Sequence, residues 1–139
     1  IHGLWPDNKS IMLNNCDSDV KYNRITNPDM LIQLEYHWPD LTSTVGDTRK
    51  LQDFWRYEFN KHGTCSINRY NQVQYFDLAL KLKNQLDLLK TLRSHGIIPG
   101  KDCTVKDVED AIKAVSAHVP NLNCIGRSSH TMELQEIGI

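Results

Sequence analysis

Two short segments of the sequence bring together side chains that exchange protons and side chains that stabilise negative charge. Within residues 58–65, a carboxylate, an ammonium and an imidazole fall at Glu58, Lys61 and His62. In a helix, Glu58 and His62 are i,i+4 neighbours and Lys61 lies beside them. A second imidazole, His2, lies between an isoleucine and a glycine. Two imidazoles with a carboxylate and a fixed cation are suited to proton transfer at a phosphate ester.

Each of these groups also has an ordinary structural interpretation. Glu58 and Lys61 match an i,i+3 ion pair on a solvated helix face, and a lone histidine such as His2 is most often structural. The aromatic residues between positions 54 and 59 favour the functional interpretation, because they would anchor this helix in a core. A position near the helix C-terminus is expected to favour the protonated form of His62.

The sequence predicts no metal site and no cofactor. Glu58 and His62 have the spacing of metal ligands on a helix, but no third ligand lies nearby and Lys61 would repel a dication. We assign no catalytic role to the remaining histidines, which are His37, His95, His118 and His130.

Length and composition predict a single domain spanning residues 1–139. The apolar and charged fractions, 40% and 24%, are ordinary for a globular protein. No apolar run approaches the roughly 18 residues of a membrane span, so we predict no membrane partner. The formal net charge of −1 gives no evidence for a polyanionic partner, so binding of nucleic acid would depend on a local cluster of charge.

Cysteine spacing and one glycosylation sequon indicate secretion. The four cysteines lie too far apart for a zinc knuckle or a redox motif, so disulfides in an oxidising compartment are expected: Cys16, Cys65, Cys103 and Cys124. Asn8 opens the sequon Asn-Lys-Ser and is a candidate glycosylation site. The sequence begins inside a motif and ends on an apolar run, so we expect a piece of a longer secreted chain.

The elements that must position the candidate residues are mostly helices. Asn27 and Pro28 predict a helix start, with the helix ending before Pro39. Further periodic segments predict helices over about 54–63, 70–93 and 104–115, the last with an apolar stripe of Val108, Ile112 and Val115. A strand is expected at 131–139, less clearly than the helices, and residues 1–4 could be the end of another strand. Loops are expected over 8–26 and 40–50. This is an α+β pattern.

Segments 1–7 and 54–65 together resemble the two active-site segments of the ribonuclease T2 family, in the same order. Segments 70–80, 95–100 and 136–139 look more narrowly like the pistil self-incompatibility ribonucleases of the nightshade type. The resemblance covers nearly the whole chain. It implies a ribonuclease T2-like fold, in which several helices flank an antiparallel sheet.

The resemblance also implies an activity. Family members cleave single-stranded RNA without a metal, by attack of the ribose 2′-hydroxyl on phosphorus to give a 2′,3′-cyclic phosphate. It makes His62 the base and His2 the acid, while Glu58 and Lys61 stabilise the anionic transition state. A self-incompatibility member would be a monomer secreted into the style matrix and taken up by pollen tubes, where it acts as the female determinant.

One position departs from the family pattern. The residue before the glutamate is usually a histidine that helps to hold phosphate, and here it is Tyr57. A tyrosine hydroxyl can bond a phosphate oxygen but brings no charge, so weaker binding is expected. Phe54 matches an aromatic residue that stacks on a base, although it also fits a plain core position.

The resemblance further pairs Cys16 with Cys65 in a disulfide and gives Cys124 a partner outside this chain, while Cys103 has no counterpart. It implies that parts of 17–26 and 42–53 carry allele identity and meet a pollen F-box protein. Two alternatives remain open: an S-like ribonuclease induced by stress or phosphate starvation, and a catalytically silent recognition or storage protein on the same scaffold.

Overall fold

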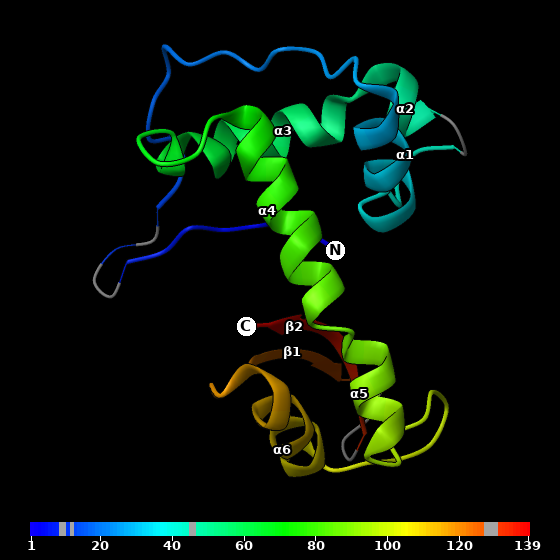
Figure 1. Ribbon diagram of the computed structural model, residues 1–139. Coiled ribbons are helices and arrows are strands. Elements are labelled where there is room, and N and C mark those ends of the chain that lie inside the picture. Colours follow the sequence, from blue (N-terminus) through cyan, green and yellow to red (C-terminus); the bar gives the residue numbers. More distant parts are fainter. Residues whose placement is uncertain (9–10, 12, 45–46, 127–130) are drawn as a thin grey trace. The chain divides into compact units, whose positions relative to one another are not determined.

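The computed structural model of the protein describes residues 1–8, 11, 13–44, 47–126 and 131–139. These residues fall into two compact units, Ile1–Gln85 and Leu86–Ile139. The first unit contains, in chain order, α1 Pro28–His37, α2 Asp47–Leu51, α3 Asp53–Lys61, the 3₁₀ helix η1 Gly63–Ser66 and α4 Gln72–Gln85 (Figure 1). The second contains α5 Leu88–Ser94, α6 Val105–Ser116, β1 Asn121–Gly126 and β2 Met132–Gly138. No helix in the described ranges is long and apolar enough to cross a membrane.

The two clearest capping signals in the sequence produce the expected helices. α1 follows Asn27, whose side chain accepts a hydrogen bond from the N–H of Met30, and Pro28 occupies the first turn. α6 follows Thr104, which forms a reciprocal capping box with Asp107. Both helices therefore begin where a side chain satisfies free backbone N–H groups, and their predicted bounds agree with the structure within two residues.

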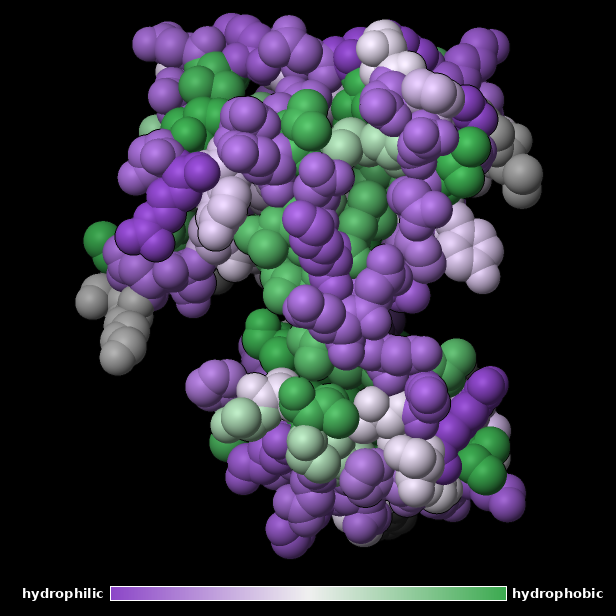
Figure 2. Space-filling model, in the orientation of Figure 1, coloured by the Kyte–Doolittle hydropathy of each residue, from purple (hydrophilic) through white to green (hydrophobic). Residues whose placement is uncertain are grey.

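An aromatic cluster forms the core of the first unit. Its fully buried rings come from the end of α1, from α3 and from α4: Trp38, Trp55, Phe59, Tyr75 and Phe76. The rings of Trp38 and Phe76 lie 5.4 Å apart between centroids, and those of Phe59 and Tyr75 lie 5.7 Å apart. Figure 2 shows mostly hydrophilic side chains on the visible surface of this unit. Burial of these rings fixes the position of α3, which carries most of the candidate site.

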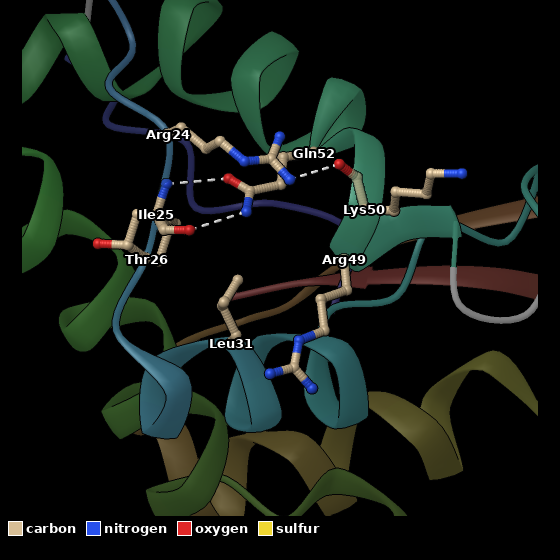
Figure 3. Close-up of a pocket in the computed structure, with 7 residues that line it drawn as sticks. All are labelled: Arg24, Ile25, Thr26, Leu31, Arg49, Lys50 and Gln52. Carbon is tan, nitrogen blue, oxygen red and sulfur yellow. Dashed lines mark hydrogen bonds between the residues drawn. The ribbon is translucent and has the colours of Figure 1, made fainter.

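Two glutamine side chains hold the extended chain that precedes α1. Gln52, in a left-handed conformation before α3, accepts from the N–H of Ile25 at 2.9 Å and donates to its carbonyl at 2.9 Å (Figure 3). Its Oε1 also accepts from the hydroxyl of Tyr22 at 2.7 Å. Gln72, at the start of α4, makes the same pair of bonds to Asn23, at 2.8 and 2.6 Å. Side-chain amides thus take the place of a neighbouring strand.

The second unit combines two helices with a two-stranded antiparallel sheet. β1 pairs with β2 so that Asn121 lies opposite Gly138, and a register shift falls between Asn123 and Cys124. Val108 and Ile112 of the predicted apolar stripe on α6 are buried, but Val115 is 45% exposed, so the prediction is wrong for Val115.

Two helix predictions need correction. Residues 40–50 were expected to be a loop, yet Asp47–Leu51 form α2. The hydroxyl of buried Thr48 accepts from the N–H of Asp40 at 3.2 Å, a tertiary contact that a five-residue helix cannot announce by periodicity. The single helix expected over 70–93 is two helices. The first ends at Gln85, and the carboxylate of Asp87 accepts from the N–H of Lys90 and caps the second.

The strand predictions are confirmed in part. β2 occupies most of the expected 131–139, whereas its partner β1 was not predicted. The polar Asn-Leu-Asn-Cys sequence at the start of β1 alternates, but it lacks β-branched residues and was not recognised as a strand. Residues 1–4 form no strand in the structure and are held differently, as described below.

Candidate active site

Aromatic side chains of the core hold the backbone of the first residues in place. The indole N–H of buried Trp38 donates to the carbonyl of His2 at 2.7 Å. The hydroxyl of buried Tyr75 donates to the carbonyl of Leu4 at 2.8 Å. These two bonds do what a strand pairing would have done, because they fix alternate residues of an extended segment. His2 is therefore carried on a backbone anchored to the same core as α3.

Trp5 connects the two candidate histidines. Its ring stacks on that of His62 with centroids 5.2 Å apart and an interplanar angle of 29°. It meets the ring of His2 edge-on, with centroids 5.0 Å apart. Its indole N–H also donates to Oε2 of Glu58 at 3.0 Å. One side chain thus contacts three of the four predicted acid–base and charge-stabilising groups, although they come from segments almost 60 positions apart in the sequence.

Gly3 allows this close approach. A Cβ atom at this position would overlap both the indole nitrogen of Trp5 and the carboxylate of Glu58. The packing of Trp5 against Glu58 therefore leaves no room for a side chain at position 3. Sequence reasoning did not identify Trp5 as the residue that joins the site.

The imidazole of His62 is buried, and its surroundings lower its pKa. Only 6% of the residue is exposed, and its buried Nδ1 meets no hydrogen-bond partner among the described residues. Burial, followed by the positive charge of Lys61 and then of His2, lowers the pKa of His62 below 6.5. The backbone of Leu13 acts in the opposite direction and raises the pKa, although it forms no hydrogen bond with Nδ1 of His62. This direction is opposite to the one expected from the position of His62 near the helix C-terminus, and desolvation is the largest cause of the lowered pKa.

The side chain of Glu58, on α3, is almost completely buried. Its exposed fraction is 2%, and its Oε2 accepts the indole bond described above. Burial of a carboxylate costs free energy unless the carboxylate is hydrogen-bonded. In a site of low dielectric, the charge of a buried group acts strongly on its neighbours. Glu58 is therefore placed to interact strongly with a phosphate bound in the site.

Lys61 and Tyr57 form a pair on the exposed side of α3. Nζ of Lys61 donates to the hydroxyl of Tyr57 at 3.0 Å and lies 5.2 Å from the centroid of its ring. The hydrogen bond raises the pKa of Lys61 above its ordinary value, so the ammonium stays charged. Phe54 is half-buried and packs against the aromatic core, so both interpretations of its ring, as core residue and as stacking surface, remain compatible with its position.

A disulfide joins Cys16 to Cys65, the pairing that the resemblance implied, with Cα atoms 4.9 Å apart. Next to it, the N–H of Asn15 donates to the carbonyl of Lys61 at 2.7 Å. The loop after the first active-site segment is therefore attached to the end of α3 by a covalent bond and a hydrogen bond. Cys103 and Cys124 are not disulfide-bonded in the structure.

Several predicted positions take no part in this arrangement. Asn8 is exposed, and its side chain accepts from the N–H of Ile11 at 3.0 Å. Lys9 and Ser10 of the sequon lie outside the described residues, as does His130. Within the described ranges, no group of three or more His, Cys, Asp or Glu residues is placed to hold a metal ion.

Comparison with known proteins assigns the chain to a family. The model of the ribonuclease T2 family matches residues 1–139, and the protein belongs to this family. The chain is 47% identical over its whole length to Ribonuclease S-2 of Nicotiana alata, of which it spans 63%.

Two solved structures confirm the fold. The self-incompatibility associated SF11-RNase of Nicotiana alata matches with a TM-score of 0.92 and 46% identity, over 99% of this chain and 70% of that one. A mutant of RNase MC1 in complex with 5′-GMP matches with a TM-score of 0.81 and 31% identity, over 96% of this chain and 68% of that one. The prediction of an α+β, ribonuclease T2-like fold is confirmed.

Proposed function

We propose that the whole protein is an endoribonuclease that cleaves single-stranded RNA by metal-independent transesterification. The observation that carries this proposal is the contact of Trp5 with His2, His62 and Glu58, which gathers two imidazoles and a carboxylate at one place. Relatives of the chain are named as ribonucleases, and one solved relative holds a nucleotide, 5′-GMP. A catalytically silent protein on this scaffold would have no need of such a cluster.

The proposed first half of the reaction forms a cyclic phosphate. Neutral His62 takes the proton of the ribose 2′-hydroxyl as its oxygen attacks the adjacent phosphorus. The bond from phosphorus to the 5′-oxygen breaks, and His2 gives that leaving oxygen a proton. A 2′,3′-cyclic phosphate and a free 5′-hydroxyl result. The lowered pKa of His62 supports this division of roles, because the base must be unprotonated at the start.

Charge on the phosphorane is stabilised by the groups beside the histidines. Lys61 supplies a positive charge at the exposed edge, and Glu58, buried on the same helix, donates a hydrogen bond to a phosphoryl oxygen when it carries a proton. The 2′-hydroxyl requirement explains why RNA and not DNA would be the substrate. Phe54 would offer its accessible face to a base, for which stacking contributes about 1–3 kcal/mol.

We further propose that the protein is secreted and acts as the female determinant of self-incompatibility. The two segments implied in recognition, 17–26 and 42–53, are adjacent in the first unit, since Gln52 bonds to Ile25 and Arg24 donates to the carbonyl of Lys50 at 2.5 Å (Figure 3). Exposed side chains of both segments could then meet one partner, a pollen F-box protein. Expression restricted to the style would support this role, and induction by stress or phosphate starvation would support the S-like alternative.

Cleavage of RNA by the whole protein in excess EDTA tests the proposed activity. His62→Ala and His2→Ala should each lower kcat/KM by roughly 10²–10⁴-fold, the usual contribution of a general acid or base. His118→Ala is the matched control, because this histidine is exposed and lies outside the site. Unchanged activity in either of the two variants would overturn the mechanism, and loss of activity in EDTA would return Glu58 and His62 to the role of metal ligands.

A further inference from the structure

The backbone of Lys61 is fixed far more tightly than its side chain. Its carbonyl accepts from Asn15, and the adjoining disulfide between Cys16 and Cys65 attaches the same turn to the preceding loop. The ammonium, at the end of four methylene groups, has no such restraint from the backbone. A lysine side chain loses up to about 2 kcal/mol of conformational freedom when it is held in one geometry. Something must hold Nζ if it is to meet a phosphate reproducibly.

Tyr57 is placed to do this. It lies one turn before Lys61 on α3, its hydroxyl accepts the hydrogen bond of Nζ at 3.0 Å, and its ring lies 5.2 Å from the same atom. Acceptor and π-face both attract the ammonium, and the rigid phenol has only two side-chain torsions. The residue itself is 55% exposed, so the pair is accessible to a molecule that approaches from solvent.

We propose that Tyr57 is a positioning residue that holds the ammonium of Lys61 for the developing negative charge on phosphorus. The inference rests on the proposed ribonuclease activity and deepens it. It replaces the expectation that Tyr57 serves as an independent, weaker phosphate contact. At the position where the family usually has a histidine, this chain aligns a neighbouring cation in place of adding one of its own.

A double-mutant cycle in the whole protein separates the two roles. Tyr57→Phe removes the hydroxyl and keeps the ring, while Lys61→Met removes the ammonium and keeps most of the side-chain volume. If Tyr57 acts through Lys61, Tyr57→Phe should lower kcat about 5- to 10-fold with KM unchanged, because the lost interaction matters mainly in the transition state. In the Lys61→Met background the same change should alter kcat by less than about twofold.

Controls distinguish positioning from folding. Tyr70→Phe removes a hydroxyl from another exposed tyrosine and should leave kcat unchanged. Tyr57→Gln keeps a hydrogen-bond acceptor one turn before Lys61. Its kcat should therefore lie between that of Tyr57→Phe and that of the unmodified protein. Thermal midpoints of all these variants should agree within about 2 °C, because Tyr57 and Tyr70 are exposed and Lys61 is only half-buried.

Every other result overturns the proposal. An equal loss in both backgrounds, or a loss that appears in KM, would make Tyr57 a separate phosphate contact and leave the ribonuclease mechanism intact. No loss in Tyr57→Phe would show that Lys61 needs no alignment. Full activity in Lys61→Met would remove the role of Lys61 altogether, while the His62→Ala measurement would still decide the proposed function on its own.

Discussion

At the scale of single residues, Trp5 accounts for how the site is assembled. Its two ring contacts and its indole bond link His2, His62 and Glu58 without a hydrogen bond between the two imidazoles being needed. The stacked indole also covers one side of His62, which contributes to the burial that lowers the pKa of this imidazole.

The lowered pKa of His62 predicts the pH dependence of cleavage. The base works only when unprotonated, so kcat/KM should rise with pH and level off once His62 is neutral. Since burial, Lys61 and His2 all lower its pKa, the midpoint of this rise should lie below 6.5. Lys61→Met removes one of these causes and should move the midpoint upward. Profiles of kcat/KM between about pH 4 and 8 measure both; a midpoint at or above 6.5 in the unmodified protein would contradict the assignment.

The same shift has a consequence for stability with a definite sign. An unfolded chain binds a proton at this histidine more readily than the folded one does. Stability associated with His62 is therefore fully present above pH 6.5 and is lost as the pH falls through the lower, folded-state pKa.

Residue types could be predicted from the sequence, whereas their contacts could not. His2, Glu58, Lys61 and His62 stand out because their chemistry and spacing are visible in one dimension. Trp5 is equally visible, but its indole had no evident target until the fold brought residue 58 to it. The signal that could have found it is an aromatic N–H two residues after a glycine, in a segment that already carried a candidate histidine.

At the scale of elements, prediction succeeded where the information is local. The starts of α1 and α6 depend on capping side chains within three residues of the helix, and both were predicted. α2 and the segment held by Gln52 depend on partners at least eight positions away, so no local pattern reveals them. Long-range side-chain bonds to backbone, absent from periodicity rules, decide this part of the fold.

The two glutamines offer a direct measure of such bonds. Gln52→Ala should lower the free energy of unfolding by about 3 kcal/mol, because it leaves buried polar groups of Ile25 and the hydroxyl of Tyr22 without partners. Gln72→Ala removes the same kind of amide pair from exposed Asn23, where water replaces it, and should cost about 1 kcal/mol or less.

Urea unfolding monitored by fluorescence gives the free energy of unfolding of both glutamine variants. The two losses can be compared if the m-value does not change. Equal losses in the two variants would show that burial of the bonded backbone does not decide the cost. A loss in Gln72→Ala that exceeds the loss in Gln52→Ala would contradict the proposed role of Gln52 as the main attachment of the segment before α1.

At the scale of the whole molecule, the candidate site lies entirely within Ile1–Gln85, and its parts come from both ends of a long stretch of sequence. The aromatic core positions α3, and bonds from Trp38 and Tyr75 position the first residues. The loop that follows the first residues is positioned by a disulfide. This bond joins Cys16 to Cys65, 49 positions later, and so attaches the loop covalently next to the C-terminal end of α3, beside Lys61 and His62.

We expect the disulfide between Cys16 and Cys65 to contribute more to the free energy of unfolding than any other single bond among the described residues. A loop of this length restricts the unfolded state by about 4 kcal/mol in the chain-entropy model. Cys16→Ala with Cys65→Ala should lower the free energy of unfolding by about this amount, whereas Cys103→Ala, at an exposed cysteine with no disulfide, should leave it unchanged. Denaturant titration of the whole protein measures both. Because Asn15 and Lys61 lose an adjacent restraint, the double variant should also bind substrate less well under conditions in which it remains folded. Full stability of the double variant would mean that the aromatic core alone holds the two active-site segments together.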